Sequence, residues 1–201
     1  MRLNIQMICA AAVLYVTLPA SGQQVSVGFD PALTKISWSL AGNVHNTHGT
    51  FQLKEGSARV DASHGTASGE LIVEAESGES GNGARDKRMK KEILEADRYP
   101  EIRFTVTKLE GAISGDAAAN VRVFGRFDIH GASHSISIPL TVKIKGVDFS
   151  GSGKFVVPFV DWGMKDPSNF LFKVDKTVEV QIVVVGHVTT APLASSVNLR
   201  N

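Results

Sequence analysis

Four of the six histidines lie in two close pairs, and paired histidines can bind a metal ion. His45 and His48 are three residues apart, and His130 and His134 are separated by a short segment that contains a glycine. A zinc site needs three or four converging ligands. The chain has no HExxH spacing and no cysteine beyond Cys9. The pattern therefore predicts no metal site and indicates polar turn residues that hydrogen-bond the backbone.

Carboxylates and nucleophiles are the other groups that could carry out catalysis. Glu74 and Glu76 are two residues apart, but they fall on the predicted water-facing side of a strand. No GxSxG motif is present, and Cys9 lies in the apolar N-terminal segment. We therefore predict that the protein is not an enzyme and requires no cofactor.

Arg85 and Asp86 form an adjacent charged pair with two interpretations. A guanidinium offers a two-pronged donor that could hold a ligand's polar head group. The pair could instead fix a strand-to-helix turn through backbone carbonyls and the helix N-terminus, and we favour this structural role. The basic run at 87–91 would allow transient contact with an anionic membrane. A solvated helix face is the simpler interpretation of that run.

Residues 1–22 predict a secretory signal peptide that is cleaved before Gln23. The segment has Arg2 near its start, an apolar run at 7–16 and small residues at 20–22. An uncleaved membrane anchor is disfavoured, because a spanning helix needs about 20 apolar residues and this run is shorter. We therefore expect a periplasmic or secreted protein.

The charge and length of the chain limit the remaining function classes. There are 21 Lys and Arg against 20 Asp and Glu, a balance that gives no reason to expect a nucleic-acid partner. Cleavage of the signal peptide removes the single cysteine, so no disulfide is available. Residues 23–188 have the length of one domain, and residues 189–201, which lack a pattern, are expected to be a mobile tail. Nothing in the sequence fixes the oligomeric state.

Apolar and polar residues alternate with a period of two along most of residues 33–187. Such alternation predicts strands with one apolar and one wet face. Glycine-containing segments at 54–57, 110–111, 130–133 and 150–153 predict turns between the strands. About eight strands are expected, a number that can close into an antiparallel barrel without exposed edges. The predicted fold class is all-β, with one short helix inserted between strands.

The predicted inner face of this barrel is apolar. An eight-stranded barrel is either filled by its side chains or holds one small ligand, and the sequence alone leaves both outcomes open. Met89 of the predicted helix and Trp162 of the last long loop are additional candidates for contact with a ligand, although Trp162 could equally be a plug. The strand candidates for a cavity lining are Phe51, Leu53, Leu71, Val73, Phe104, Phe127, Ile129, Ile138, Leu140, Phe155, Val157 and Phe159.

Residues 84–95 interrupt the alternation. They contain few β-branched residues and many helix formers, and Met89 and Ile93 would lie on one helical face. A single short helix between strands is expected to cover one end of the barrel.

Three segments in order along the chain resemble motifs of the YceI-like family of bacterial exported proteins. The first is His48-Gly49-Thr50-Phe51 at a strand start. The second joins Arg85-Asp86 to Tyr99-Pro100-Glu101-Ile102-Arg103-Phe104. The third is the Trp162-Gly163-Met164 loop before the last strand. The resemblance covers roughly residues 33–186.

This resemblance implies a lipocalin-like barrel that encloses an isoprenoid lipid, such as a polyprenyl chain or a quinone tail. Some relatives have a histidine soon after the Arg-Asp pair, whereas this chain has only lysine and arginine there, so a histidine that contacts a head group is not expected. The alternative function is a barrel with a filled core that acts through its outer surface as a stress-response or adhesion module.

Overall fold

The computed structural model describes residues 24–61, 66–113 and 116–190. The predicted signal peptide lies outside these residues, as does the predicted tail beyond residue 190. The last strand continues through Thr190, so the barrel domain extends two residues beyond the boundary expected at 188. The strands are β1 (Gln24–Phe29), β2 (Lys35–Leu40), β3 (Thr47–Phe51), β4 (Leu53–Asp61), β5 (Thr66–Glu74), β6 (Glu101–Glu110), β7 (Ala119–Ile129), β8 (Ala132–Lys145), β9 (Asp148–Val157) and β10 (Val178–Thr190).

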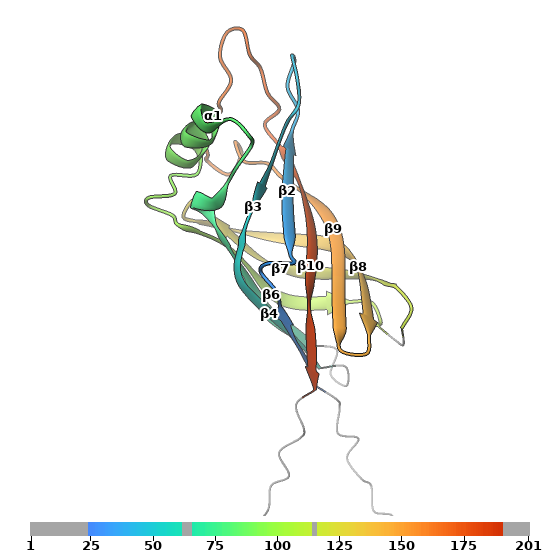
Figure 1. The fold of residues 1–201 in the computed structure, drawn as a ribbon. Coiled ribbons are helices and arrows are strands. Elements are labelled where there is room, and N and C mark those ends of the chain that lie inside the picture. The colour runs from blue at the N-terminus through green and yellow to red at the C-terminus, as the bar shows by residue number, and fades with distance from the viewer. Residues whose placement is uncertain (1–23, 62–65, 114–115, 191–201) are drawn as a thin grey trace, which may run out of the picture.

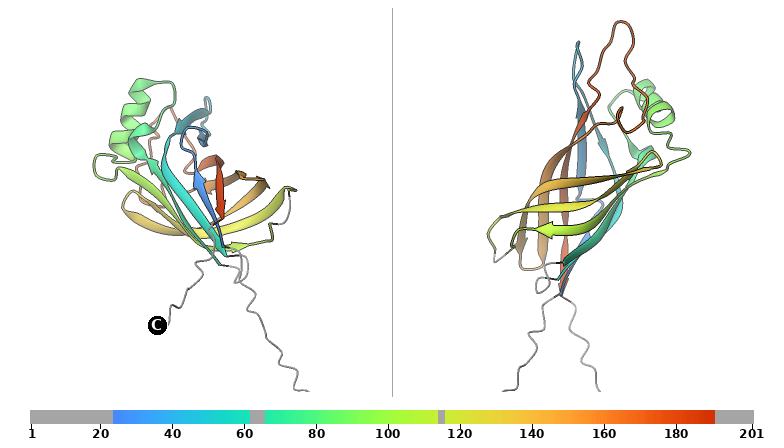
Figure 2. Two further views of the ribbon diagram at one scale, coloured as in Figure 1. Left: turned by 60° about the horizontal axis from the view of Figure 1, so that its bottom comes forward. Right: turned by 180° about the vertical axis from the view of Figure 1, so that it is seen from behind.

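These strands form one closed antiparallel barrel with eight positions around its circumference (Figures 1 and 2). The order is β1-β4-β5-β6-β7-β8-β9-β10, and β10 pairs again with β1. β2 pairs with the part of β10 that precedes its contact with β1, and β3 pairs with β2. In the described part of the chain, β1 and β2 therefore lie end to end and together occupy one position in the barrel. β3 and β4 share another position in the same way. The predicted eight-stranded barrel is confirmed.

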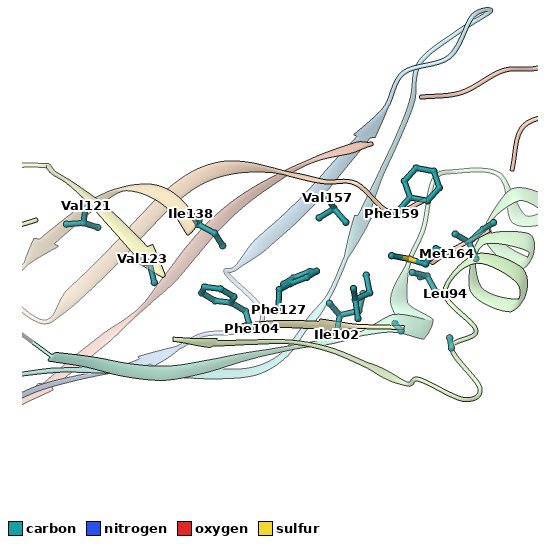
Figure 3. Close-up of a cluster of buried hydrophobic side chains, with 14 of the residues drawn as sticks. Leu94, Ile102, Phe104, Val121, Val123, Phe127, Ile138, Val157, Phe159 and Met164 are labelled. Atoms are coloured by element: carbon teal, nitrogen blue, oxygen red, sulfur yellow. The ribbon is translucent and has the colours of Figure 1, made fainter. Parts of the chain in front are cut away.

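Strand β7 shows how alternating side chains produce an apolar interior. Val121, Val123 and Phe127 are buried, and the alternating Arg122 and Arg126 are exposed. Because successive side chains of a strand point to opposite faces, every second residue contributes to one continuous apolar interior. Figure 3 shows this interior with side chains from several strands pointing toward one another.

Two of the predicted turns are wrong. Residues 54–57 lie inside β4 and residues 150–153 lie inside β9. Their glycines permit close packing between strands: a Cβ on Gly56 would lie 2.8 Å from the ring of Phe29, and one on Gly153 would lie 2.3 Å from the Pro139 carbonyl oxygen. The predicted turn at 130–133 is confirmed at His130-Gly131, where both residues have positive φ.

The predicted helix is confirmed as two consecutive segments. α1 (Gly83–Arg88) begins after Asn82, whose side chain accepts a hydrogen bond from the Arg85 amide at 3.1 Å. It continues as a wider π-helical segment, η2 (Met89–Ile93), in which the Leu94 amide donates to the Met89 carbonyl. A short 3₁₀ turn, η1 (Ala75–Ser77), precedes α1.

The helix, the β2–β3 hairpin and the loop 158–177 all lie at the same end of the barrel (Figures 1 and 2). Among the described residues, no helix is long and apolar enough to span a membrane.

Candidate functional site: an apolar cavity in the barrel

The barrel encloses a cavity of about 390 Å³. Its lining begins at the strand ends farthest from α1, with Val60, Ala67 and Leu109, and continues to Met89 and Pro167 at the α1 end. The cavity therefore extends along the barrel axis. Ligand sites in proteins typically measure about 300–1,000 Å³. The interior is hollow on a scale that suits one small or slender ligand.

Most of the candidates predicted from the sequence line this cavity. Met89 reaches it from the helix, as expected, and the other side chains come from strands β3 and β5–β9 or follow directly after β9. The candidates that line the cavity are Phe51, Leu71, Val73, Met89, Phe104, Phe127, Ile129, Ile138, Leu140, Phe155, Val157 and Phe159.

Leu53 and Trp162 do not line it. Leu53 is buried, but the register of β4 against β5 shifts between Leu53 and Glu55, which breaks the alternation there. Trp162 stacks on the His134 ring, with centroids 3.9 Å apart and planes at 5°, and lies 5.8 Å from the Phe127 ring. Trp162 therefore packs against the lining residue Phe127 and does not itself border the cavity.

Sequence reasoning missed the contribution of β1, β2 and the closing elements. Val27 and Phe29 of β1 and Ile36 and Trp38 of β2 line the cavity, as does Met164 of the loop 158–177. The alternation of Ile36, Trp38 and Leu40 was a usable signal. Met164 belongs to the Trp162-Gly163-Met164 motif, but no alternation indicated that it faces inward, because a loop residue reaches the cavity only through the closed fold.

The charged residues of the lining, within the described chain, are Arg85 and Arg88, both from α1. Arg85 donates from Nε to the Ser80 hydroxyl at 2.7 Å and from a terminal nitrogen to the Ser80 carbonyl at 2.9 Å. Arg88 lies 3.6 Å from a carboxylate oxygen of Glu92. One end of an otherwise apolar cavity thus carries positive charge.

Asp86 does not share this position. It accepts a hydrogen bond from the Ser80 hydroxyl and lines a shallow outer depression together with Lys87 and Lys90. Arg85 and Asp86 therefore converge on Ser80 from different sides. These contacts hold Ser80, which lies two residues before the Asn82 cap of α1.

The histidines are dispersed. His45 and His48 are exposed near the β2–β3 hairpin, and Nε2 of His130 lies 3.4 Å from a carboxylate oxygen of Glu95. His134 was expected at a turn but lies within β8, and its Nε2 is buried without a hydrogen-bond partner among the described residues. No group of three His, Cys, Asp or Glu in the described residues is arranged to hold a metal ion.

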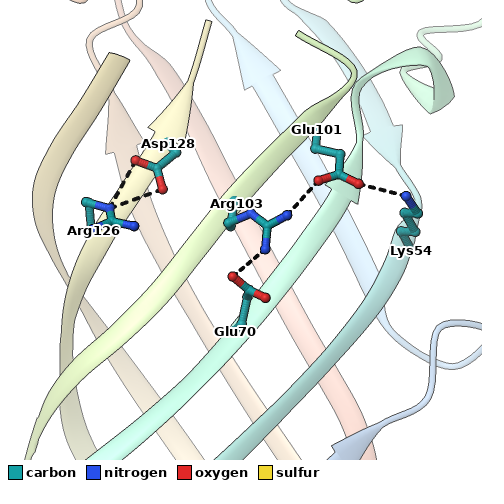
Figure 4. Close-up of polar contacts among 6 residues, drawn as sticks. All are labelled: Lys54, Glu70, Glu101, Arg103, Arg126 and Asp128. Carbon is teal, nitrogen blue, oxygen red and sulfur yellow. Dashed lines mark hydrogen bonds and ion pairs between the residues drawn. The ribbon is translucent and has the colours of Figure 1, made fainter. Parts of the chain in front are cut away.

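The outer face of strands β4–β7 carries ion pairs (Figure 4). Arg103 contacts Glu101 at 2.7 Å and Glu70 at 2.5 Å, and Lys54 contacts Glu101 at 2.7 Å. The hydrogen bonds from Lys54 and Arg103 hold the pKa of Glu101 below its ordinary value. Glu74 is exposed at the end of β5, as predicted, whereas Glu76 is exposed in the turn η1 and not on a strand.

The YceI-like domain matches residues 28–186. The chain belongs to the YceI-like family. This match confirms the resemblance carried by the three ordered motifs. No curated protein matches the chain.

Several solved structures share the fold. Burkholderia cenocepacia BcnA has a TM-score of 0.65 at 21% identity, over 78% of this chain and 98% of its own. A polyisoprenoid-binding domain from Saccharophagus degradans, implicated in plant cell wall breakdown, has a TM-score of 0.60 at 18% identity, over 83% of this chain and 98% of its own. The Campylobacter jejuni YceI protein has a TM-score of 0.52 at 19% identity, over 73% of this chain and 84% of its own.

Proposed function

We propose that this YceI-like protein is a non-enzymatic carrier or reservoir that holds a long isoprenoid chain, a polyprenyl lipid or a quinone tail, in its barrel. The observation that carries the proposal is the cavity of about 390 Å³ with an apolar wall along the barrel axis. An elongated apolar space matches an elongated apolar ligand. The polyisoprenoid-binding domain with the same fold supports this choice of ligand. The cavity counts against the alternative of a filled core.

The charges at the cavity end give the bound lipid a direction. Arg85 and Arg88 lie in the lining at the α1 end, and the remaining lining consists mainly of hydrocarbon side chains. A polar or anionic head group would gain charge-assisted hydrogen bonds only beside these guanidinium groups. We therefore place the head group at the α1 end and the tail in the barrel.

The energetics favour recognition of the tail over the head group. Burial of a methylene-sized group contributes about 0.8 kcal/mol, so one five-carbon isoprene unit contributes roughly 4 kcal/mol before ordering costs. Ordering a flexible group costs about 0.5–1.5 kcal/mol for each one immobilised. Several isoprene units would bind without any polar anchor. Affinity should therefore depend on chain length until the cavity is full.

Titration of delipidated protein with isoprenoid alcohols of increasing length tests the proposal. Trp38 lines the cavity and Trp162 does not, so tryptophan emission should change on binding in the wild type and change much less in Trp38→Phe. Affinity should rise with length and then level off. Emission that stays constant for every chain length, together with no bound alcohol after gel filtration, would refute the isoprenoid cargo.

We further propose that the protein is exported and begins at or near Gln23 after removal of residues 1–22. The charge, the short apolar run and the small residues before Gln23 support this cleavage. Intact-mass analysis of protein from an exporting host should give the mass of residues 23–201. A mass that still includes Met1 would contradict it.

A further inference from the structure

The loop 158–177 carries an exposed apolar segment at its tip, Phe170-Leu171-Phe172. These side chains are 94%, 68% and 52% exposed. Val44 of the adjacent β2–β3 hairpin is 63% exposed. The loop and the hairpin project beyond the strands at the α1 end of the barrel (Figures 1 and 2). Large apolar side chains grouped at a protruding point mark an interaction site.

The tip is a braced turn. The Asn169 side chain accepts hydrogen bonds from the Leu171 amide at 3.0 Å and the Phe172 amide at 2.8 Å, and the Asn169 amide donates to the Phe172 carbonyl at 2.9 Å. Asn43 of the hairpin donates from its side chain to the Leu171 carbonyl at 3.2 Å and accepts from the Lys173 amide at 3.0 Å. The Asn43 amide donates to the Lys173 carbonyl at 3.0 Å.

These bonds satisfy every backbone N–H and C=O group of Leu171, Phe172 and Lys173. An unpaired backbone group costs several kcal/mol in hydrocarbon, so non-helical backbone enters lipid only when its polar groups are paired. The two asparagines thus pair the backbone groups of residues 171–173, which lowers the cost of transferring this part of the turn from water into lipid. Leu171 and Phe172 therefore combine exposed apolar side chains with a satisfied backbone, which is the property that a membrane-inserting tip requires.

The charges around the tip offset one another. Residues 41–48 and 167–174 contain no Asp or Glu and one lysine, Lys173, but Asp166 and Asp175 lie directly beside the second segment. Lys176 and Lys173 are near enough to Asp166 to help lower its pKa. The lysines of α1 and η2 likewise surround a depression that four acidic residues line. Contact with a bilayer would therefore depend on the apolar side chains of the tip.

The size and shape of the tip disfavour a protein partner. A stable protein interface buries about 800 Å² on each side and needs a complementary surface. Large aromatic side chains bury about 150–250 Å² each, so three or four residues on a convex point supply only part of that area. A fluid bilayer surface needs no complementary shape.

We propose that Phe170–Phe172, with Val44 beside them, insert into the interfacial region of a lipid bilayer and turn the α1 end of the barrel toward the membrane. This orientation would bring the charged end of the cavity to the surface from which an apolar cargo has to come. The proposal goes beyond cargo binding and does not depend on it, because docking requires only the tip and a bilayer.

Flotation of delipidated protein with isoprenoid-free vesicles tests the docking. Vesicles of phosphatidylethanolamine with phosphatidylglycerol and vesicles of phosphatidylcholine should both carry the wild type, because the inserting side chains are apolar. The double variant Phe170→Ser/Leu171→Ser should bind at least about 10-fold more weakly, because it removes two insertable side chains. Val147→Ser is the matched control, since Val147 is also 63% exposed but lies in the β8–β9 turn at the opposite end of the barrel. All three proteins share the same N-terminus and should have the same melting temperature.

Insertion itself is visible in a Phe170→Trp variant, whose added emission should shift to shorter wavelength with vesicles and be quenched by brominated lipid. Equal flotation of the double variant and the wild type would overturn the proposal, as would a wild type that binds neither vesicle. Self-association of the wild type that the double variant abolishes, without vesicle binding, would assign the tip to a second copy of this chain. Loss of docking with normal isoprenoid binding would leave the carrier function standing.

Discussion

The two faces of strands β5–β7 differ in polarity: the inner face is apolar and the outer face is charged. On the inner face, side chains such as Phe104 and Val123 border empty space with no polar partner. On the outer face, Arg103 is held by two carboxylates and Arg126 pairs with Asp128 at 3.2 Å (Figure 4). The polar contacts that look most specific are thus exposed to water, where each is worth little. The face with no specific contacts is the one that can select a ligand.

The largest expected effect comes from moving a charge between these faces. Val123→Asp is nearly isosteric and places an unpaired carboxylate on the buried face, which should cost about 3 kcal/mol or more. Arg122→Asp, one residue away, puts the same carboxylate in water, where it faces Glu110 of the neighbouring strand, and should cost about 1 kcal/mol or less. Thermal unfolding should show a decrease of roughly 10 °C for the first variant and of about 4 °C or less for the second.

Similar melting temperatures for the two variants would mean that Val123 does not face the interior. Loss of stability in Arg122→Asp alone would reverse the assignment of the faces.

An intermediate effect on stability is expected when a larger side chain is introduced into the interior. The size of the loss distinguishes the hollow parts of the interior from the filled parts. Leu140 lines the cavity, so Leu140→Trp should leave the melting temperature of delipidated protein nearly unchanged and favour shorter isoprenoids. Ala75 is only 1% exposed and is not part of the lining, so Ala75→Leu should cost about 1–3 kcal/mol by overpacking. Measured unfolding free energies check the pair. A larger loss for Leu140→Trp than for Ala75→Leu would show that no usable space exists at Leu140.

The smallest effect is expected on the outer face. Lys54 and Arg103 lower the pKa of Glu101, so its carboxylate stabilises the folded protein fully above the ordinary pKa of 4.5 and loses that contribution as the pH falls through the lowered pKa. Glu101→Gln should therefore reduce the melting temperature slightly near neutral pH, and the difference should vanish in acid. High salt should also reduce it, because these groups are exposed. A difference that grows in acid would contradict this assignment.

Much of the fold could be predicted because alternation is a local property of the sequence. The inner residues of β7 and β8 follow a strict period of two, and the structure places them as expected. The interruption between β1 and β2 was not predicted; there the Thr34 hydroxyl hydrogen-bonds the backbone of Val185, 151 residues away, and such a contact has no local signature in the sequence. Gly56 and Gly153 lie in segments that the sequence predicts as turns. Both are in strands, where the absence of a side chain lets a neighbouring strand come close, and this close approach appears only in the packed barrel.

The candidate site shows the same limit. Apolar alternation predicted which side chains face inward, but whether they meet depends on the radius of the closed barrel. The irregular register beside Leu53 and the stacking of Trp162 on His134 removed two candidates from the lining, and neither contact has a signature in the local sequence. Arg88 was expected on the solvated side of the helix, yet it contributes to the cavity end.

Mass spectrometry of an organic extract of the purified protein tests the central claim most directly. We expect a co-purified isoprenoid at close to one molecule per barrel in the wild type, with shorter chains from Leu140→Trp at the same yield of folded protein. Extracts of both proteins without isoprenoid, from a host that makes such lipids, would contradict the assignment of the cavity to an isoprenoid cargo.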